Sequence, residues 1–339
     1  MRIVYNNIEQ IILREVMSMH YVAGGDSGKS MTKLTLQTGE GNIRVSFPTT
    51  FEETDTKTKT DLNHEVYYQG TRYLVGEPNK KLNRINRTVR SKEQEVHKVC
   101  LLTALCLAIK EAEKDEDSKQ IKVHDVTLTL NMPFDDFLDK NQRDSIVKYY
   151  QSPKMVDMTV DGEKFNLMLK VVAYYEGLGA VLLKADEIKD KRVVSIDFGS
   201  LNVNYLTVDK LKPVVAECGS LDFGCGRLLT SIKKLFSSKG IKNINADSEI
   251  LRALSGDNEY ISREVIEEAN KLIETHVESI YSELFDLEVD VDNIQIIASG
   301  GAANLYEPFF NRIFPNKNVT LLKENTTFAN AEGSLKLLK

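Results

Sequence analysis

Two stretches of the chain carry an aspartate and a glycine two positions apart, each directly after an apolar run. They are Asp26-x-Gly28 and Asp197-x-Gly199. A tight glycine turn between two strands can present backbone N–H groups to a phosphate, and the aspartate can hold a hydrated Mg²⁺, which keeps several of its waters. One such turn is weak evidence, because these turns are common. Two of them, about 170 residues apart, predict a triphosphate held from both sides.

Polar residues after each turn extend the predicted site. Lys33 can neutralise phosphate charge, and Lys29 either adds a second positive charge or points to solvent. Gly300 and Gly301 end an apolar strand, where a flat ligand can approach the backbone, although on their own an ordinary strand–helix turn explains them more easily. The predicted nucleotide-binding residues are Gly28, Lys29, Ser30, Lys33, Gly199, Ser200, Asn202, Gly300, Gly301 and Ala302, and the predicted Mg²⁺ ligands, through water, are Asp26 and Asp197.

The first turn also fits a relaxed P-loop pattern at residues 23–30, with alanine in place of the first glycine. A P-loop runs directly into a helix, whose first N–H groups bind phosphate. Here residues 31–36 alternate between apolar and polar types, Gly39 and Gly41 supply a turn, and residues 43–47 alternate again. This pattern favours a β-hairpin over a P-loop.

The elements that position these residues follow from the hydrophobic periodicity. The strand–Asp-x-Gly–turn–strand layout of residues 20–36 recurs at 192–208. We therefore predict a duplicated α/β fold with two lobes and a nucleotide cleft. Domain I is expected at 1–184 plus 325–339, with residues 1–18 as an extension, and domain II at 185–324. The other predicted elements are a hairpin at 64–75, helices at 91–114, 138–150, 226–238, 262–280 and 328–338, and strands at 123–131, 155–160, 164–174 and 293–298.

Composition excludes several function classes. The chain has 339 residues and a net charge of −6, which disfavours a protein that grips DNA phosphates with its whole surface. The four cysteines lack the spacing of a zinc site, so we expect buried, reduced thiols. No apolar run approaches the ~18 residues of a membrane span. Residues 1–16 have an unusual pattern, and we expect the natural chain to start at Met17 or Met19.

The three motifs, in this order, resemble the phosphate-one, phosphate-two and adenosine motifs of the actin-like ATPase superfamily. The resemblance is strongest to the bacterial plasmid-segregation actins of the ParM/StbA type, and it covers the chain from about residue 19. Residues 68–77 look like the hairpin of that family, and residues 328–333 look like the start of its C-terminal helix. The departures are the N-terminal extension and Lys29, where the family usually has a small or polar residue.

This resemblance implies roles that spacing alone does not give. Glu176 lies where the family carries a residue that orients the attacking water, so we expect Asp26, Asp197 and Glu176 to be catalytic. The alternative for Glu176 is a solvated carboxylate favoured by a helix start. The resemblance also implies an actin-like (ribonuclease-H-like) fold, ATP or GTP with Mg²⁺ as cofactors, and a cytoplasmic, bacterial, plasmid-encoded protein.

The implied function is reversible filament assembly that segregates plasmid DNA, with hydrolysis of ATP or GTP after assembly. The implied partners are further copies of the chain and a centromere-binding adaptor protein (ParR-like) that carries the DNA, with no membrane and no direct DNA binding. Two alternatives remain open. One is a non-filament kinase or ATPase of the same fold, and the other is an actin homologue that serves cell shape or a phage.

Overall fold

The computed structural model describes residues 18–77, 92–114, 123–242, 244, 247–255, 261–314, 318–322 and 326–338. Residues 1–17, which carry the prediction about the start of the chain, lie outside them. The chain forms two compact units. Unit 1 is Met1–Asn131, Asp139–Tyr174 and Leu338–Lys339, and unit 2 is Met132–Leu138 and Tyr175–Leu337. These packing units differ from the predicted domain limits, which follow the duplicated pattern and stay a prediction.

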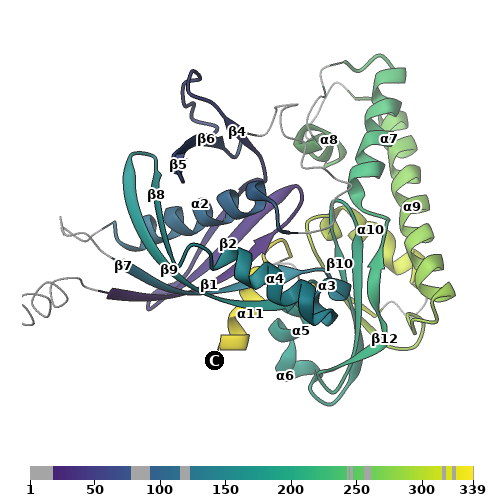
Figure 1. Cartoon of the computed structure of the whole chain (residues 1–339). Helices are drawn as coiled ribbons and strands as arrows, with labels where there is room; N and C mark the ends of the chain where they lie inside the picture. The colour runs from purple at the N-terminus through teal and green to yellow at the C-terminus, as the bar shows by residue number, and fades with distance from the viewer. Residues whose placement is uncertain are drawn as a thin grey trace, which may run out of the picture. The chain divides into compact units, whose positions relative to one another are not determined.

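A nine-stranded sheet forms the centre of unit 1 (Figure 1). Its order is β3-β2-β1-β7-β9-β8-β5-β6-β4, and β1 and β7 are parallel whereas β1, β2 and β3 form an antiparallel meander. The strands are β1 (Ser18–Ser27), β2 (Met31–Thr38), β3 (Gly41–Pro48), β4 (Phe51–Glu53), β5 (His64–Tyr68), β6 (Thr71–Val75), β7 (Val123–Met132), β8 (Met155–Val160) and β9 (Glu163–Tyr175). Because Met31 opens a strand rather than a helix, the hairpin prediction is confirmed and the P-loop is excluded.

Helix α2 (Glu95–Ala112) packs against β1, β2 and β3. Thirteen of its eighteen residues are buried, including polar His97 and Lys98. A helix that is buried on nearly all sides belongs to a core rather than a surface, which explains why its apolar stretch is long. A second helix of this unit, α4 (Lys140–Tyr150), has Asp139 as its N-cap. The Asp139 carboxylate accepts hydrogen bonds from the N–H groups of Asn141 and Gln142. The cap sets the start of α4 two residues later than predicted.

Unit 2 repeats the strand order of unit 1 with a five-stranded sheet, β12-β11-β10-β13-β14. Here β10, β11 and β12 form the antiparallel meander, and β13 lies parallel to β10 as β7 lies parallel to β1. The strands are β10 (Arg192–Phe198), β11 (Val203–Asp209), β12 (Lys212–Leu221), β13 (Gln295–Ser299) and β14 (Val319–Leu321). The predicted α/β class with a duplicated layout is confirmed.

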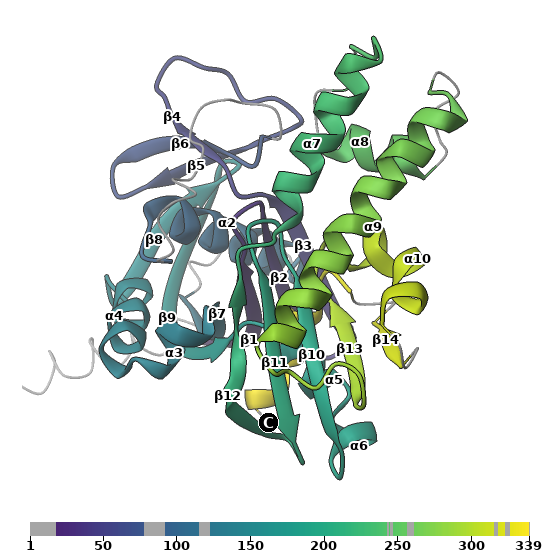
Figure 2. The same ribbon diagram turned by 90° about the vertical axis from the view of Figure 1, so that its right-hand side faces the viewer.

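The two faces of β10 point into two different cores. Val194, Ile196 and Phe198 pack against one set of helices. Two members of this set, α7 and α9, lie side by side (Figures 1 and 2). Val193 packs on the opposite face. Since side chains alternate along a strand, Asp197 shares the face of Val193. The first face carries α7 (Cys225–Ser238), α8 (Asp247–Leu254), α9 (Arg263–Asp286) and α10 (Ala303–Ile313), and the second carries α3 (Phe134–Leu138), α5 (Leu178–Leu183), α6 (Ala185–Ile188) and α11 (Ala329–Ser334), which continues as the 3₁₀ helix η1 (Leu335–Leu338).

Two glycines let α5 and α11 touch through their backbones. A Cβ on Gly179 would lie 2.2 Å from the carbonyl oxygen of Ala329, and a Cβ on Gly333 would lie 2.0 Å from the carbonyl oxygen of Gly179. No side chain separates the helices at this crossing, so the position of α11 depends directly on α5. None of the helices in the described part of the chain is long and apolar enough to cross a membrane.

We predict that Gly179→Ala destabilises the protein. Alanine gains about 1 kcal/mol of helix propensity over glycine, but its methyl group meets backbone that cannot rotate away, and overpacking of this kind costs about 1–3 kcal/mol. The expected result is a thermal midpoint lowered by several degrees. Gly39→Ala is the matched control, because no atom lies within 4 Å of its Cβ position. Equal midpoints for the two variants would contradict the close crossing.

Candidate functional site

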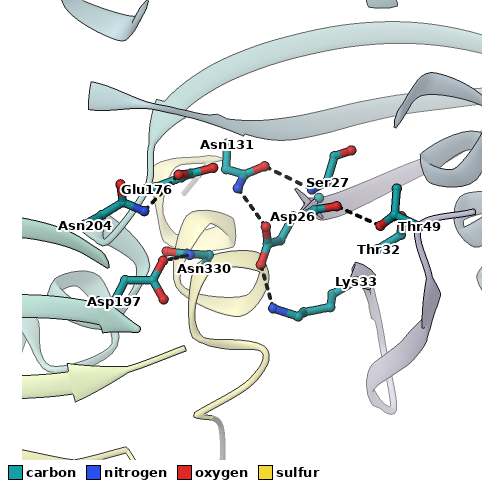
Figure 3. A network of polar contacts seen from close by, with 12 residues as sticks. Asp26, Ser27, Thr32, Lys33, Thr49, Asn131, Glu176, Asp197, Asn204 and Asn330 are labelled. Atoms are coloured by element: carbon teal, nitrogen blue, oxygen red, sulfur yellow. Dashed lines mark hydrogen bonds and ion pairs between the residues drawn. The ribbon is translucent and has the colours of Figure 1, made fainter. Parts of the chain in front are cut away.

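Asp26 is the second-to-last residue of β1 in unit 1 and is 4% exposed. Its cross-strand partner in the antiparallel register is Lys33. The Lys33 ammonium lies 3.1 Å from Asp26 Oδ2, and the carboxamide of Asn131 on β7 donates to Asp26 Oδ1 at 2.7 Å (Figure 3). Burying a carboxylate is costly unless ion pairs or hydrogen bonds compensate for the lost water, and this one has both kinds of partner. Neutralisation of phosphate charge by Lys33 stays a prediction, and the sequence predicts neither the pairing of Lys33 with Asp26 nor the contact of Asn131.

The turn after Asp26 is held in one shape. A Cβ on Gly28 would lie 2.6 Å from the carbonyl oxygen of Met31, so a larger residue does not fit without movement of the backbone. Thr49 binds the turn twice: its hydroxyl donates to the carbonyl of Gly28 at 2.7 Å, and its N–H donates to the carbonyl of Ser30 at 2.9 Å. Lys29 is half-buried and Ser30 is exposed. The loop is therefore preformed.

A polar cluster supports this turn from inside unit 1. The N–H of Ser27 donates to Asn131 Oδ1 at 3.0 Å, the Lys92 ammonium donates to the carbonyl of Ser27, and the Ser27 hydroxyl lies 2.8 Å from His97 Nδ1. Burial, together with the charges of Lys92 and Lys29, lowers the pKa of His97 to about 3. His97 is thus neutral at physiological pH, and the site keeps the positive charge of its lysines alone.

Unit 2 repeats the turn. Asp197 is 7% exposed, and the Asn330 carboxamide donates to its Oδ2 at 2.9 Å. A Cβ on Gly199 would lie 2.7 Å from the carbonyl oxygen of Asn202, which stands at the same offset from its glycine as Met31 does from Gly28. The two Asp-x-Gly turns therefore share one steric constraint, and each aspartate accepts a hydrogen bond from an asparagine far away in the sequence.

The start of α7 holds the second turn in place. The N–H groups of Gly224, Cys225 and Gly226 donate to the carbonyls of Leu201, Gly199 and Ser200. A Cβ on Gly224 would lie 2.1 Å from the carbonyl carbon of Leu201, which explains the glycine at this position. The Asn202 side chain donates to Asn204 and Ser220. These contacts fix the carbonyl side of the loop, while ligand binding by Gly199, Ser200 and Asn202 stays a prediction.

Glu176 is half-buried and directly precedes Gly177, the N-cap of α5. The Asn204 carboxamide donates to Glu176 Oε2 at 2.9 Å (Figure 3), and the Glu176 N–H donates to the carbonyl of Met132 at 2.9 Å. Gly177 has φ 86°, a conformation that favours glycine. Glu176 is therefore held by the protein, which makes a freely solvated helix-start carboxylate a poor description of it.

Position 300 has to be a glycine because the Asp197 carboxylate lies where a Cβ would be. Gly300 has φ +96°, and a Cβ there would lie 2.3 Å from Asp197 Oδ1 and 2.6 Å from the carbonyl oxygen of Phe198. The N–H of Ala302 donates to that same carbonyl at 3.1 Å. The sequence left open an approaching ligand and an ordinary strand–helix turn as reasons for this glycine, and the steric need found here comes from the protein itself. No atom lies within 4 Å of the Cβ position of Gly301, and ligand contact at 300–302 stays a prediction.

The carboxylates fit the type of metal site that the sequence predicts. Among the described residues, no three His, Cys, Asp or Glu side chains gather closely enough to form a metal-binding group. A Mg²⁺ ion at Asp26 or Asp197 would therefore take most of its ligands from water and phosphate oxygens, which is how this ion usually binds in nucleotide sites. The two aspartates therefore suit Mg²⁺ in the type of donor atom that they offer, which is carboxylate oxygen.

We predict that His97 makes the stability of the protein depend on acidity. The unfolded chain takes up a proton near pH 6.5, and folded His97 takes one up only near pH 3, so stability falls as the pH falls through this window. Between pH 7 and 5 this costs about 2 kcal/mol. Chemical denaturation at the two pH values should show a smaller loss in His97→Asn than in the original protein. Equal losses would mean that His97 is protonated in the folded state.

Comparisons with known proteins agree with this geometry. Residues 24–179 match the family model described as "Actin like proteins N terminal domain". No curated protein matches the chain by sequence. The chain is similar to the archaeal actin homolog Ta0583 in complex with ADP, with 21% identity, a TM-score of 0.73, and coverage of 94% of this chain and 99% of that one.

Two further solved structures are similar. The Alp12 filament structure has 20% identity, a TM-score of 0.67, and coverage of 94% of this chain and 98% of that one. The apo psk41 parM protein has 16% identity, a TM-score of 0.63, and coverage of 94% and 96%. At these identities the likeness shows the fold. The chain thus matches an actin-like N-terminal domain at residues 24–179 and has the actin-like fold over 94% of its length, as the resemblance predicted.

Proposed function

We propose that this chain binds a nucleoside triphosphate with Mg²⁺, polymerises into filaments, and hydrolyses the nucleotide after assembly. The observation that carries the proposal is the repeated turn. In each unit a buried aspartate is the second-to-last residue of a strand, the glycine two positions later has no room for a Cβ, and an asparagine donates to the carboxylate. We infer that both turns bind the same nucleotide.

The proposed roles follow from the charge and position of each group. Bound Mg²⁺ would neutralise phosphate charge, and Asp26 and Asp197 would hold the waters of that ion. Lys33, which is 3.1 Å from Asp26, supplies a cation next to the predicted phosphate turn. Glu176, oriented by Asn204, would position the attacking water. Phosphoryl transfer is mostly positioning and charge neutralisation, so these groups suffice.

Filament assembly is proposed from the relatives. One similar structure is a filament and another is a complex with ADP, and each statement applies to that protein. For this chain we propose self-assembly that moves plasmid DNA, in a plasmid-encoded bacterial system, through a ParR-like adaptor protein. The net charge of −6 suits an adaptor better than direct contact with DNA. A kinase of the same fold is the alternative, and it would turn over nucleotide without assembling.

The experiment that tests the proposal is sedimentation combined with phosphate release, run in parallel with Mg-ATP, Mg-GTP and no nucleotide. Nucleotide-dependent pelleting, followed by phosphate release and disassembly, is the expected result, and it also identifies the preferred base. Phosphate release without pelleting at any tested concentration would refute the filament and favour a kinase or ATPase. Plasmid loss after deletion of the gene separates DNA segregation from a role in cell shape.

We predict that Asp26→Asn and Asp197→Asn each weaken Mg-nucleotide binding by at least tenfold, because each removes a negative charge beside the predicted Mg²⁺ waters. Lys29→Ala should weaken binding much less than either aspartate variant, since without a P-loop Lys29 supplies no more than a second positive charge beside the phosphates. Asp157→Asn is the matched control, because its carboxylate is 62% exposed and forms a surface ion pair with Lys164. Fluorescent-nucleotide titration measures all four variants. A large effect of only one aspartate would mean that the two turns do not share a ligand.

A further inference from the structure

Asn330, in the first turn of α11, makes two hydrogen bonds that connect separate parts of unit 2. Its carboxamide nitrogen donates to Asp197 Oδ2 at 2.9 Å, and its carboxamide oxygen accepts the N–H of Gly177 at 3.1 Å. It therefore joins Asp197 (Figure 3) to Gly177, the residue next to Glu176. Asn330 is 6% exposed, so both bonds lie where water competes little.

These bonds close a ring. Asp197 and Asn204 face each other as cross-strand partners on β10 and β11. The Asn204 side chain holds the Glu176 carboxylate, and the backbone of the next residue, Gly177, is held by Asn330, which returns to Asp197. Each member is fixed by its two neighbours, so the separation between the Asp197 and Glu176 carboxylates is set by two asparagines.

The backbone around the ring is held as tightly as the side chains. A Cβ on Gly179 would lie 2.4 Å from the Cα of Asn330, which means that α5 and α11 cannot slide past each other at this level. The Ser195 hydroxyl donates to the carbonyl of Gly177 at 2.9 Å, so Gly177 is bound on both its N–H and its carbonyl. The two peptide groups that flank Gly177 are thus held by different elements: the one toward Glu176 by α11 and the one toward Leu178 by β10.

We propose that Asn330, together with Asn204, is a positioning residue for hydrolysis: it holds the carboxylate that orients water at a fixed distance from the carboxylate that holds Mg²⁺ waters. This inference rests on the proposed function for the roles of Asp197 and Glu176. Misplacement of such groups by about 1 Å is enough to slow a reaction by ~10²-fold. The pair therefore acts on the rate of hydrolysis more than on nucleotide affinity.

Asn131, which binds Asp26 in unit 1, differs from Asn330 in what its carboxamide connects. Asn131 also donates to an aspartate, but its carboxamide oxygen accepts the N–H of Ser27, which is the residue directly after Asp26. These two bonds hold neighbouring residues of one turn, and the same oxygen lies 3.5 Å from the Lys92 ammonium in the cluster that supports that turn. Asn330 spans from one predicted catalytic carboxylate to the neighbour of another, and the two asparagines thus have different consequences when removed.

The test is a double-variant cycle on the full chain. Phosphate release in a single turnover and the affinity for Mg-nucleotide are measured for Asn330→Ala, Glu176→Gln and the combination. We expect Asn330→Ala to slow release at least tenfold with affinity changed less than threefold. The combination should be no slower than Glu176→Gln alone, because both changes act through one carboxylate. Asn293→Ala, at an exposed asparagine of unit 2, is the control.

Two further variants keep the test decisive if Asn330→Ala unfolds. Asn330→Asp retains an acceptor for Gly177 but loses the donor to Asp197, and it should release phosphate no faster than Asn330→Ala. Asn204→Ala opens the ring on the opposite side and leaves α11 unchanged, so it should show the same loss of rate with little loss of affinity. Thermal unfolding checks the fold of each variant.

The outcomes separate this inference from the proposed function. Normal phosphate release by Asn330→Ala and Asn204→Ala, with slow release by Glu176→Gln, overturns the positioning role and leaves the proposed function standing. Normal release by Glu176→Gln itself removes the catalytic assignment of Glu176 and the inference with it. Additive losses in the combined variant, accompanied by weakened nucleotide binding, would assign Asn330 a structural role only.

Discussion

A carboxylate buried at the end of a central strand is the constraint around which each unit is built. Asp26 and Asp197 are 4% and 7% exposed, and an unpaired charge at that depth would cost several kcal/mol. The fold meets this cost with groups from other elements: an ammonium and a carboxamide for Asp26, and a carboxamide for Asp197. Strand β7 and helix α11 must therefore lie where they do, since each carries the asparagine that its aspartate requires.

The same constraint explains the glycines near the carboxylates. Gly28 and Gly199 let the chain reverse directly after the aspartate, with a carbonyl oxygen in the space that a Cβ would fill. Gly300 permits the Asp197 carboxylate to lie against the end of β13, and Gly179 and Gly333 bring the helix that carries Asn330 into backbone contact with α5. In each case a missing side chain makes room for backbone or for a carboxylate of the protein.

The hairpins and the duplicated turns can be predicted from the sequence because they are local. Alternation at 31–36 and 43–47 distinguishes a strand from a P-loop helix, and the Asp-x-Gly spacing can be read directly. The supporting asparagines cannot be found this way, because Asn131 and Asn330 lie 105 and 133 residues from the aspartates they bind. For Asn131 the sequence does offer one local sign of a functional role: it is a polar residue at the end of the strand predicted at 123–131. The steric origin of Gly300 needs the packing of β10 against β13, and no local pattern contains that information.

The two turns differ in the residue that lies opposite the aspartate on the neighbouring strand, and this difference has chemical consequences. The cross-strand partner of Asp26 is Lys33, whereas the partner of Asp197 is Asn204. A lysine there places positive charge beside the first carboxylate. An asparagine carries no charge, and its carboxamide reaches Glu176 instead. The proposed division of labour requires this asymmetry: one unit offsets phosphate charge and the other fixes the geometry for water. If both positions were lysine, Glu176 would lose its hydrogen-bond donor from β11 and gain a cation, which a residue that positions a neutral water does not need.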